Sequence, residues 1–214
     1  MGLSEDSKKV VQASVTNYLN KHYSEALKDL PDNAVIKAQL SLKNLTANDL
    51  TAKQKDKIQK VLEDGVNILA FYDISILATA YNDDGEIISS LNGVEISEME
   101  EPIKLSLTIP SEFIKKNRQF GIVRLHDDIA TGLNSILDNE STITFETDQF
   151  SIYTLVGKDY TQEEVNKNPD ILNTSIVETG DDSSSLVPLI VMAVSLIIIV
   201  GVLALKKRDN KNLK

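Results

Sequence analysis

The sequence predicts a mainly β protein, an antiparallel sandwich with an N-terminal helix, one inserted surface helix and a C-terminal transmembrane helix. Short stretches rich in Val, Ile, Phe and Tyr recur between residues 66 and 156, separated by Asn, Asp, Gly and Pro, as in a sandwich. Residues 4–30 and 51–63 instead carry apolar side chains at helical spacing. Residues 186–205 contain no charged side chain. These observations divide the chain into five parts.

The first part, residues 1–31, is predicted to be an amphipathic helix. Ser4 is a suitable N-cap, and Pro31 ends the helix because proline has no backbone N–H to donate. The apolar positions at helical spacing are Val10, Val11, Val15, Tyr18, Leu19 and Leu27. We expect them to form one face.

The second part, residues 32–157, is predicted to be a β-sandwich surface module. Residues 34–42 alternate in polarity with period two, as a half-buried strand does. Residues 51–63 are rich in Lys and predict a helix on the surface, closed by Gly65. The remaining predicted strands cover residues 66–81, 86–90, 94–96, 103–109, 120–125, 133–137, 142–147 and 151–156. The acidic run at Glu98, Glu100 and Glu101 is expected to be a hydrated loop.

The third part, residues 158–185, loses most of its apolar content and ends in a polar spacer. Segments that bury too little apolar surface do not repay the entropy of folding. We therefore expect an extended tether that connects the module to the span.

The fourth part, residues 186–205, is predicted to cross a membrane. A helix of this length is about 30 Å long, which matches the hydrocarbon core of a bilayer. Fourteen of the twenty residues are Leu, Ile or Val. The last part, the tail 206–214, begins with Lys206, Lys207 and Arg208, and Lys and Arg are retained on the cytoplasmic side. We expect residues 1–185 to be extracellular.

Charge and cysteine content agree with an exterior location. The formal net charge is −10, and residues 1–185 alone carry −14. A surface of this sign repels nucleic acid, so no nucleic-acid partner is expected. There is no Cys, which favours a bacterial exterior over a disulfide-rich secreted domain. Residues 1–20 contain no apolar signal region. We therefore expect the chain to be the C-terminal piece of a longer exported protein; the alternative is that the true start lies upstream of Met1.

Two stretches resemble a known module. Residues 120–127 read FGIVRLHD and residues 143–155 read ITFETDQFSIYTL. They resemble an immunoglobulin-like stalk module of Gram-positive cell-wall proteins, in which a VHDG hairpin precedes a TFETDHFSTYAL strand pair. Asp128 stands where the module usually has Gly, and Gln149 where His is common. The resemblance covers about residues 66–157 well and 32–65 loosely. It implies an immunoglobulin-like sandwich with no catalytic residues.

The C-terminal region resembles a sortase sorting signal of the LPXTG type. Ile176, Val177, Glu178, Thr179 and Gly180 precede a polar spacer, an apolar span and a basic stop-transfer tail. The resemblance implies cleavage between Thr and Gly by sortase, a Cys transpeptidase, and attachment to cell-wall peptidoglycan. Val177 replaces the usual Pro, which fixes φ, so we expect weaker processing. A plain membrane anchor remains the alternative.

The sequence predicts no catalytic, cofactor-binding or metal-binding residues. His22 and His126 are the only histidines and are far apart in sequence. The turn at Asp83, Asp84 and Glu86 lacks the ligand series of an EF-hand. We expect a non-enzymatic stalk that anchors a surface protein to the envelope, either in the cell wall after sorting or in the membrane as a single-pass protein. The alternative is an adhesin or ligand-binding module on a plain anchor, and the sequence names no ligand for it.

Overall fold

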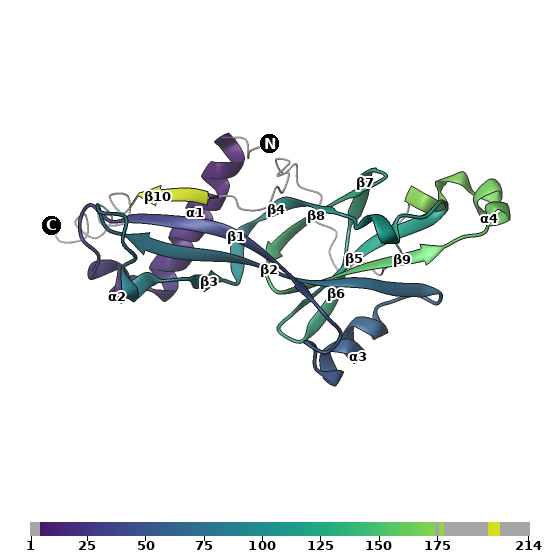
Figure 1. Ribbon diagram of the computed structural model, residues 1–214, viewed down its shortest axis with the longest axis horizontal. Coiled ribbons are helices and arrows are strands. Elements are labelled where there is room, and N and C mark those ends of the chain that lie inside the picture. The colour runs from purple at the N-terminus through teal and green to yellow at the C-terminus, as the bar shows by residue number, and fades with distance from the viewer. Residues whose placement is uncertain (1–4, 174–175, 178–196, 202–214) are drawn as a thin grey trace.

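The computed structural model describes residues 5–173, 176–177 and 197–201 of the chain. The protein is mainly β, and its long strands β1 and β2 run along the longest axis (Figure 1). The strands are β1 (Val35–Leu45), β2 (Val66–Tyr81), β3 (Val94–Ile96), β4 (Glu98–Thr108), β5 (Arg118–His126), β6 (Ile129–Leu133), β7 (Ser135–Asn139), β8 (Thr142–Gln149), β9 (Ile152–Asp159) and β10 (Ile197–Gly201). The helices are α1 (Glu5–His22), α2 (Ser24–Lys28), α3 (Ala52–Lys60) and α4 (Gln162–Lys167), with 3-10 turns η1 (Ser89–Leu91), η2 (Ser111–Phe113) and η3 (Pro169–Asn173).

The described strands form two antiparallel sheets. The larger has the order β10-β1-β2-β9-β5-β6, with β3 also paired to β2, and the smaller has the order β4-β8-β7. The sheets face each other across a shared apolar core. Within it the rings of Phe145 on β8 and Tyr153 on β9 lie 5.4 Å apart. The prediction of a mainly β, antiparallel protein with a few helices is confirmed.

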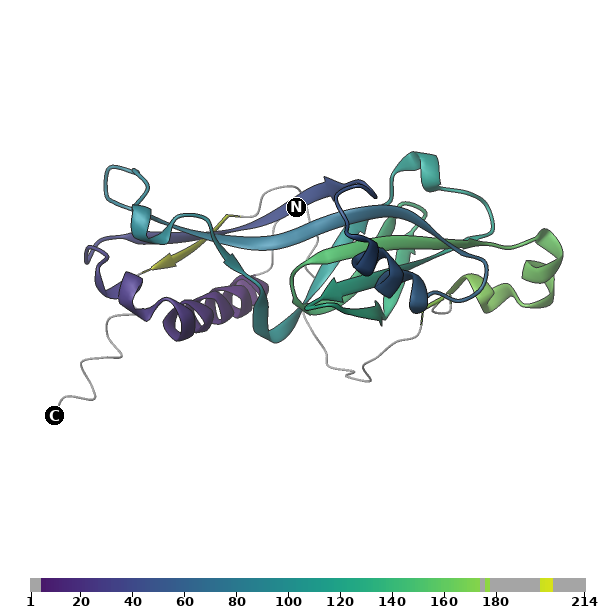
Figure 2. The ribbon, with the colours of Figure 1, turned by 90° about the horizontal axis from the view of Figure 1, so that it is seen from below.

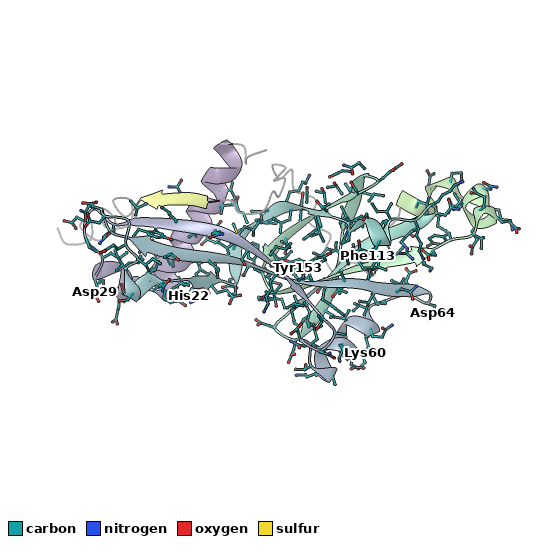
Figure 3. The ribbon with its side chains drawn as sticks, viewed as in Figure 1. His22, Asp29, Lys60, Asp64, Phe113 and Tyr153 are labelled. Carbon is teal, nitrogen blue, oxygen red and sulfur yellow. The ribbon has the colours of Figure 1, made fainter. Side chains whose placement is uncertain are left out.

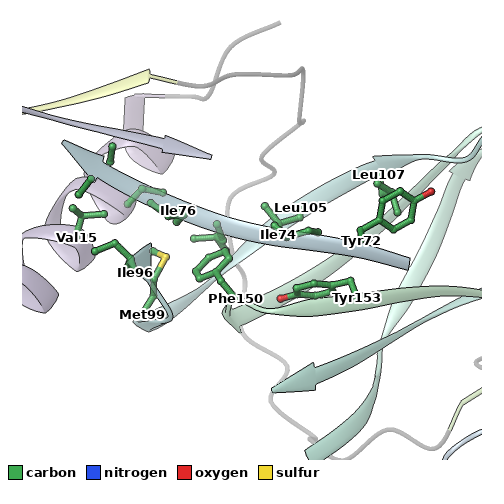
Figure 4. Packing of buried hydrophobic residues seen from close by; sticks show 14 of the residues in the cluster. Val15, Tyr72, Ile74, Ile76, Ile96, Met99, Leu105, Leu107, Phe150 and Tyr153 are labelled. Atoms are coloured by element: carbon green, nitrogen blue, oxygen red, sulfur yellow. The ribbon is translucent and has the colours of Figure 1, made fainter. Parts of the chain in front are cut away.

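The main core collects residues that are distant in sequence. Figure 4 shows Ile74 and Ile76 of β2, Leu105 of β4 and Phe150 converging in it. Alternation places these side chains there, because every second residue of a strand points to the same face. Phe150 and Leu105 are 1% and 0% exposed, so the contact between the sheets excludes water.

The N-terminal helix belongs to this core. Val11, Val15 and Leu19 of α1 are buried and pack in the same cluster as the strands. Figure 2 shows α1 beneath one end of the long β1–β2 ladder. The predicted apolar face is therefore confirmed, but the helix is not continuous, because Tyr23 separates α1 from α2.

A second, smaller cluster lies on the opposite face of the large sheet. It includes Val123 of β5, Val156 of β9 and Ile58 of α3. A bulge between Ile68 and Ala70 of β2 shifts the register against β9. An extra residue in one strand reverses which side chains face inward. Before the bulge Val66 and Ile68 face the second cluster, whereas after it the even-numbered residues from Tyr72 onward face the main core and Phe71 faces the second cluster.

The inserted helix α3 closes the second cluster. Thr51 caps it: its Oγ1 accepts from Gln54 N, and the Gln54 side chain accepts from Thr51 N, a reciprocal capping box. The helix ends before the predicted residue 63, and only Ile58 on it is buried. The remaining polar side chains face solvent, as predicted for a surface helix.

Two strand predictions and one loop prediction were wrong. Residues 86–90 are not a strand: they make one bridge, between Tyr81 and Ile87, and then enter η1. The sequence predicts one strand over residues 133–137, but the chain changes sheets at Asn134, so that β6 and β7 belong to different sheets. The acidic run expected to be a loop lies in β4, with the register irregular between Glu98 and Ile103. The first part of β4 resembles a loop in its polar composition because its glutamate side chains face solvent.

Candidate functional site

Two residues of the predicted sorting motif lie inside the fold. Ile176 and Val177 are 1% and 4% exposed and belong to the second cluster, whereas Glu178, Thr179 and Gly180 lie outside the described residues. The stop-transfer residues Lys206, Lys207 and Arg208 also lie outside them. The expectation of a tether without packing contacts is therefore wrong for part of residues 158–185.

The chain reaches Ile176 through two short helical turns. Thr161 caps α4 with a second capping box to Glu164, and η3 follows against β5. The bonds from Thr161 N and Oγ1 lower the pKa of the Glu164 carboxyl, since they stabilise its charged form. The Thr-x-x-Glu pattern at Thr161 is a capping signal that predicts the start of α4. The polar composition of residues 158–185 alone does not show it.

A glycine makes room for Ile176 on the sheet. Gly121 lies on β5, and a Cβ added to it would be 2.9 Å from Ile176 Cγ1. Contacts this short do not occur between real carbon atoms, so any larger residue at Gly121 displaces Ile176. Val177 then pairs with Leu62, just after α3, in an isolated antiparallel bridge. The segment thus spans the second cluster from β5 to the end of α3.

The predicted transmembrane segment is described only over five residues. Ile197–Gly201 form β10, which pairs antiparallel with residues 35–39 of β1. These five residues are extended, which differs from the predicted helix, and the remainder of 186–205 lies outside the described residues. Among the helices that the structure describes, none is long and apolar enough to cross a bilayer.

The two histidines are not brought together. His22 lies at the end of the molecule formed by α1 and α2, distant from the central Tyr153 (Figure 3), and its ring stacks on Tyr18 at 4.5 Å. His126 ends β5; its Nε2 is 3.6 Å from Asp127 Oδ2, and its buried Nδ1 has no hydrogen-bond partner among the described residues. Nor do the described residues contain a group of three or more His, Asp or Glu that suits a metal ion.

The acidic turn after β2 is held by its own hydrogen bonds. Asn82 Oδ1 accepts from Glu86 N at 2.8 Å, and Gly85 N donates to Asn82 O at 3.0 Å. Gly85 has φ +79, which a side chain disfavours. Asp83 is bonded to Asn33. These contacts account for the turn as a hairpin connection.

A polar cavity of about 260 Å³ lies between the sheets near Arg124. Arg124 Nη1 donates to Thr147 Oγ1 at 3.1 Å and to Asp148 Oδ1 at 3.0 Å. Thr147 Oγ1 is also bonded to the Tyr153 hydroxyl at 2.7 Å. Burial raises the pKa of Tyr153, which keeps this hydroxyl neutral. The network joins β5, β8 and β9, and sequence reasoning did not identify it because its members are separated along the chain.

An ion pair joins the buried side chain of Arg118, at the start of β5, to the half-exposed side chain of Asp159, at the end of β9. Arg118 Nη2 donates to Asp159 Oδ2 at 2.6 Å, Nε is bonded to Oδ1, and Nη1 donates to the Phe113 carbonyl at 3.0 Å. The Arg118 guanidinium therefore lowers the pKa of the Asp159 carboxyl, and Lys115 adds to the effect. This pair fixes the ends of β5 and β9.

A comparison with protein-family models found no match, and comparisons with curated proteins and with solved structures found none either.

Proposed function

We propose that the protein is a non-enzymatic stalk that anchors the C-terminal end of a bacterial surface protein to the cell envelope. The observation that carries the proposal is the order of parts along the chain: an antiparallel β module, a Thr179–Gly180 motif, a charge-free span of twenty residues and a basic tail. A span of this composition gains several kcal/mol, about 4–8, from its Leu, Ile and Val residues on entering a bilayer. The basic tail then stays in the cytoplasm.

The mainly β, antiparallel architecture supports the stalk part of the proposal. The two sheets share an apolar core, and the molecule is elongated along its long strands β1 and β2 (Figure 1). The finer assignment, an immunoglobulin-like module of Gram-positive surface proteins, rests on residues 120–127 and 143–155. In the structure these residues form much of β5, β8 and β9.

Anchoring requires one rearrangement. Ile197–Gly201 pair with β1, and the same residues cannot also form a helix in a bilayer. The proposal therefore includes release of β10 from β1 when the span inserts. Burial of the whole apolar span in lipid exceeds what five paired residues contribute at the edge of a sheet, so insertion is the favoured state when a membrane is present.

Sortase processing is the finer part of the proposal. A cysteine thiolate of the transpeptidase attacks the Thr179 carbonyl, the Thr179–Gly180 amide bond breaks, and Gly180 leaves as a new amino terminus. An amine of the wall precursor then displaces the thiolate from the Thr179 carbonyl. The chain becomes joined to peptidoglycan through Thr179, and the span is discarded.

A second candidate is an adhesin or ligand-binding module on an unprocessed single-pass anchor. Burial of Ile176 and Val177 favours an unprocessed anchor, because a transpeptidase binds an extended peptide and these two residues are 1% and 4% exposed. The two candidates differ in whether the span remains on the mature protein.

Cell fractionation with two matched variants tests the proposal. If Thr179–Gly180 is cleaved, wild-type protein resists boiling detergent and muramidase releases it from the wall. Thr179→Ala should shift the protein to the membrane fraction, whereas Glu178→Ala, at the variable position of the motif, should leave it in the wall. Wild-type protein found wholly in a mild detergent extract would exclude sorting and leave the plain anchor. Protection of the entire chain from protease added to protoplasts would exclude the extracellular orientation.

A further inference from the structure

The C-terminal segment of the module ends in a docked dipeptide rather than in solvent. Ile176 and Val177 are as buried as core residues of the strands, although they follow a polar region. The docked pair lies on the second cluster, with Val123, Val156 and Ile58 as neighbours in that cluster. An apolar dipeptide in this position closes the edge of the cluster between β5 and α3.

Two contacts hold the docked pair in place. Ile176 fills the space left by the missing side chain of Gly121, and Val177 is bridged to Leu62. In the sorting motif these are the positions of the usual Leu and Pro, so the residues that a transpeptidase reads first are those that the fold covers. Thr179 follows Val177 by two positions in the sequence.

We propose that Ile176 and Val177 are a latch that withholds the motif from a transpeptidase until the dipeptide leaves the second cluster. The proposal rests on the proposed sorting function. In the docked state the enzyme cannot bind the first two positions of its substrate. In the released state the segment is extended and cleavage at Thr179–Gly180 proceeds. Events that weaken docking, such as tension on the chain or contact with the wall, therefore raise processing without altering the motif.

Docking of the latch should slow cleavage by a measurable factor. Burial of two aliphatic side chains biases an opening equilibrium by about one to two powers of ten after the ordering cost of the segment is subtracted. The apparent affinity of an enzyme falls by the fraction of substrate that is competent. Cleavage of the docked chain should therefore be about 10-fold to 100-fold slower than cleavage of a free peptide with the same motif.

The glycine that accommodates Ile176 provides the opening variant. Gly121→Ala places a methyl group 2.9 Å from Ile176 Cγ1 and should displace the latch without changing the motif. Gly157→Ala is the matched control. Gly157 is also on a central strand, and its added Cβ would be 2.9 Å from Cδ1 of Leu69, which packs against the main core and not against Ile176. Val177→Pro is unsuitable because it alters the latch and the motif together.

A disulfide provides the closing variant. Residues paired in an antiparallel bridge have Cα atoms about 4.5–5.5 Å apart, which suits a disulfide. Because the chain has no other cysteine, Leu62→Cys with Val177→Cys has only one possible bond. The oxidised and reduced forms have the same motif sequence, so their comparison isolates docking. This pair keeps the proposal testable even if Gly121→Ala does not fold.

The test uses the full chain in detergent micelles, a sortase that accepts Leu-Pro-x-Thr-Gly substrates, triglycine as the amine, and a synthetic peptide covering residues 172–184. We expect the peptide to be cleaved about 10-fold to 100-fold faster than the full chain, and Gly121→Ala to approach the peptide while Gly157→Ala does not. The oxidised double-cysteine form should resist cleavage, and reduction should restore it. Equal rates for peptide, wild type and the oxidised form would overturn the latch alone. A peptide that is never cleaved would overturn the sorting function and the latch with it.

Discussion

Replacing Thr154 with Val should stabilise the protein, although it removes a hydroxyl from the core. Thr154 is 0% exposed on β9, and its Oγ1 has no hydrogen-bond partner among the described residues. In register it lies between Val123 and Phe71 of the neighbouring strands, which both belong to the apolar second cluster. A buried hydroxyl without a partner costs about 1–3 kcal/mol of desolvation.

Valine has the same shape as threonine and removes this cost. Both are β-branched and suit a strand, so the backbone of β9 need not move. We expect the free energy of unfolding to rise by about 1 kcal/mol, and the melting temperature by about 2–4 °C for a chain of this size. Urea unfolding of the full chain in mild detergent, followed by far-ultraviolet circular dichroism, measures the change at constant m-value.

Thr147 is the matched control because the same substitution there should have the opposite sign. Thr147 is 2% exposed, and its Oγ1 bonds to the Tyr153 hydroxyl, to Arg124 Nη1 and to the Gln149 carbonyl. Thr147→Val removes one hydrogen-bond partner from the Arg124 guanidinium and one from the Tyr153 hydroxyl. This loss should lower the free energy of unfolding by about 2–3 kcal/mol. If Thr154→Val folds normally and lowers stability, or if both variants shift in the same direction, the assignment of the unpartnered hydroxyl is wrong.

Three further predictions concern the ion pair, α3 and the acidic turn. Asp159→Asn should destabilise the protein near neutral pH, because it leaves the 6% exposed Arg118 side chain without its carboxylate. The pKa of Asp159 is lowered in the folded state. The stability that the ion pair contributes is therefore fully present above the unfolded pKa of about 3.9 and is lost as pH falls through the folded pKa. Urea titrations of wild type and Asp159→Asn should accordingly give the same free energy of unfolding in acid. Ile58→Ala should cost about 2–5 kcal/mol, since Ile58 is 0% exposed, and a smaller loss than about 1 kcal/mol in the same urea assay would show that α3 does not seal the second cluster. A chelator should not change the melting temperature; a large fall would identify a metal ion at the turn of Asp83.

Local patterns in the sequence were sufficient for most elements. The apolar and aromatic content of residues 66–81 predicts β2 with the bounds that the structure shows, because a strand that packs on both faces is apolar along most of its length. The apolar stripe of Val11, Val15 and Leu19 likewise predicts the buried face of α1. In both cases the pattern lies within a single helix or strand and can be recognised without knowing which other element packs against it.

Composition was less reliable where a few apolar residues lie in a polar stretch. Ile176 and Val177 are two aliphatic residues among polar ones, too few to predict packing, yet they are buried. Their docking depends on Gly121, which precedes Ile176 by fifty-five positions in the sequence, and on Leu62, which is more distant in sequence. The sequence predicts a sorting motif at these residues but not their burial, because no local pattern connects a glycine in β5 with a dipeptide that follows β9.

Residue patterns alone were enough to predict that the protein is mainly β, where α1 and α3 lie, that the chain is acidic outside its tail, and that a charge-free stretch follows the β module. Tertiary structure alone decided which strands share a sheet, the change of sheet at Asn134, the joining of Arg118 to Asp159, and the docking of Ile176 against Gly121. The physical reason is the range of the interactions. The spacing of apolar residues and helix capping involve residues a few positions apart in the sequence. Sheet order, ion pairs and close packing instead join residues that come together only when the chain folds.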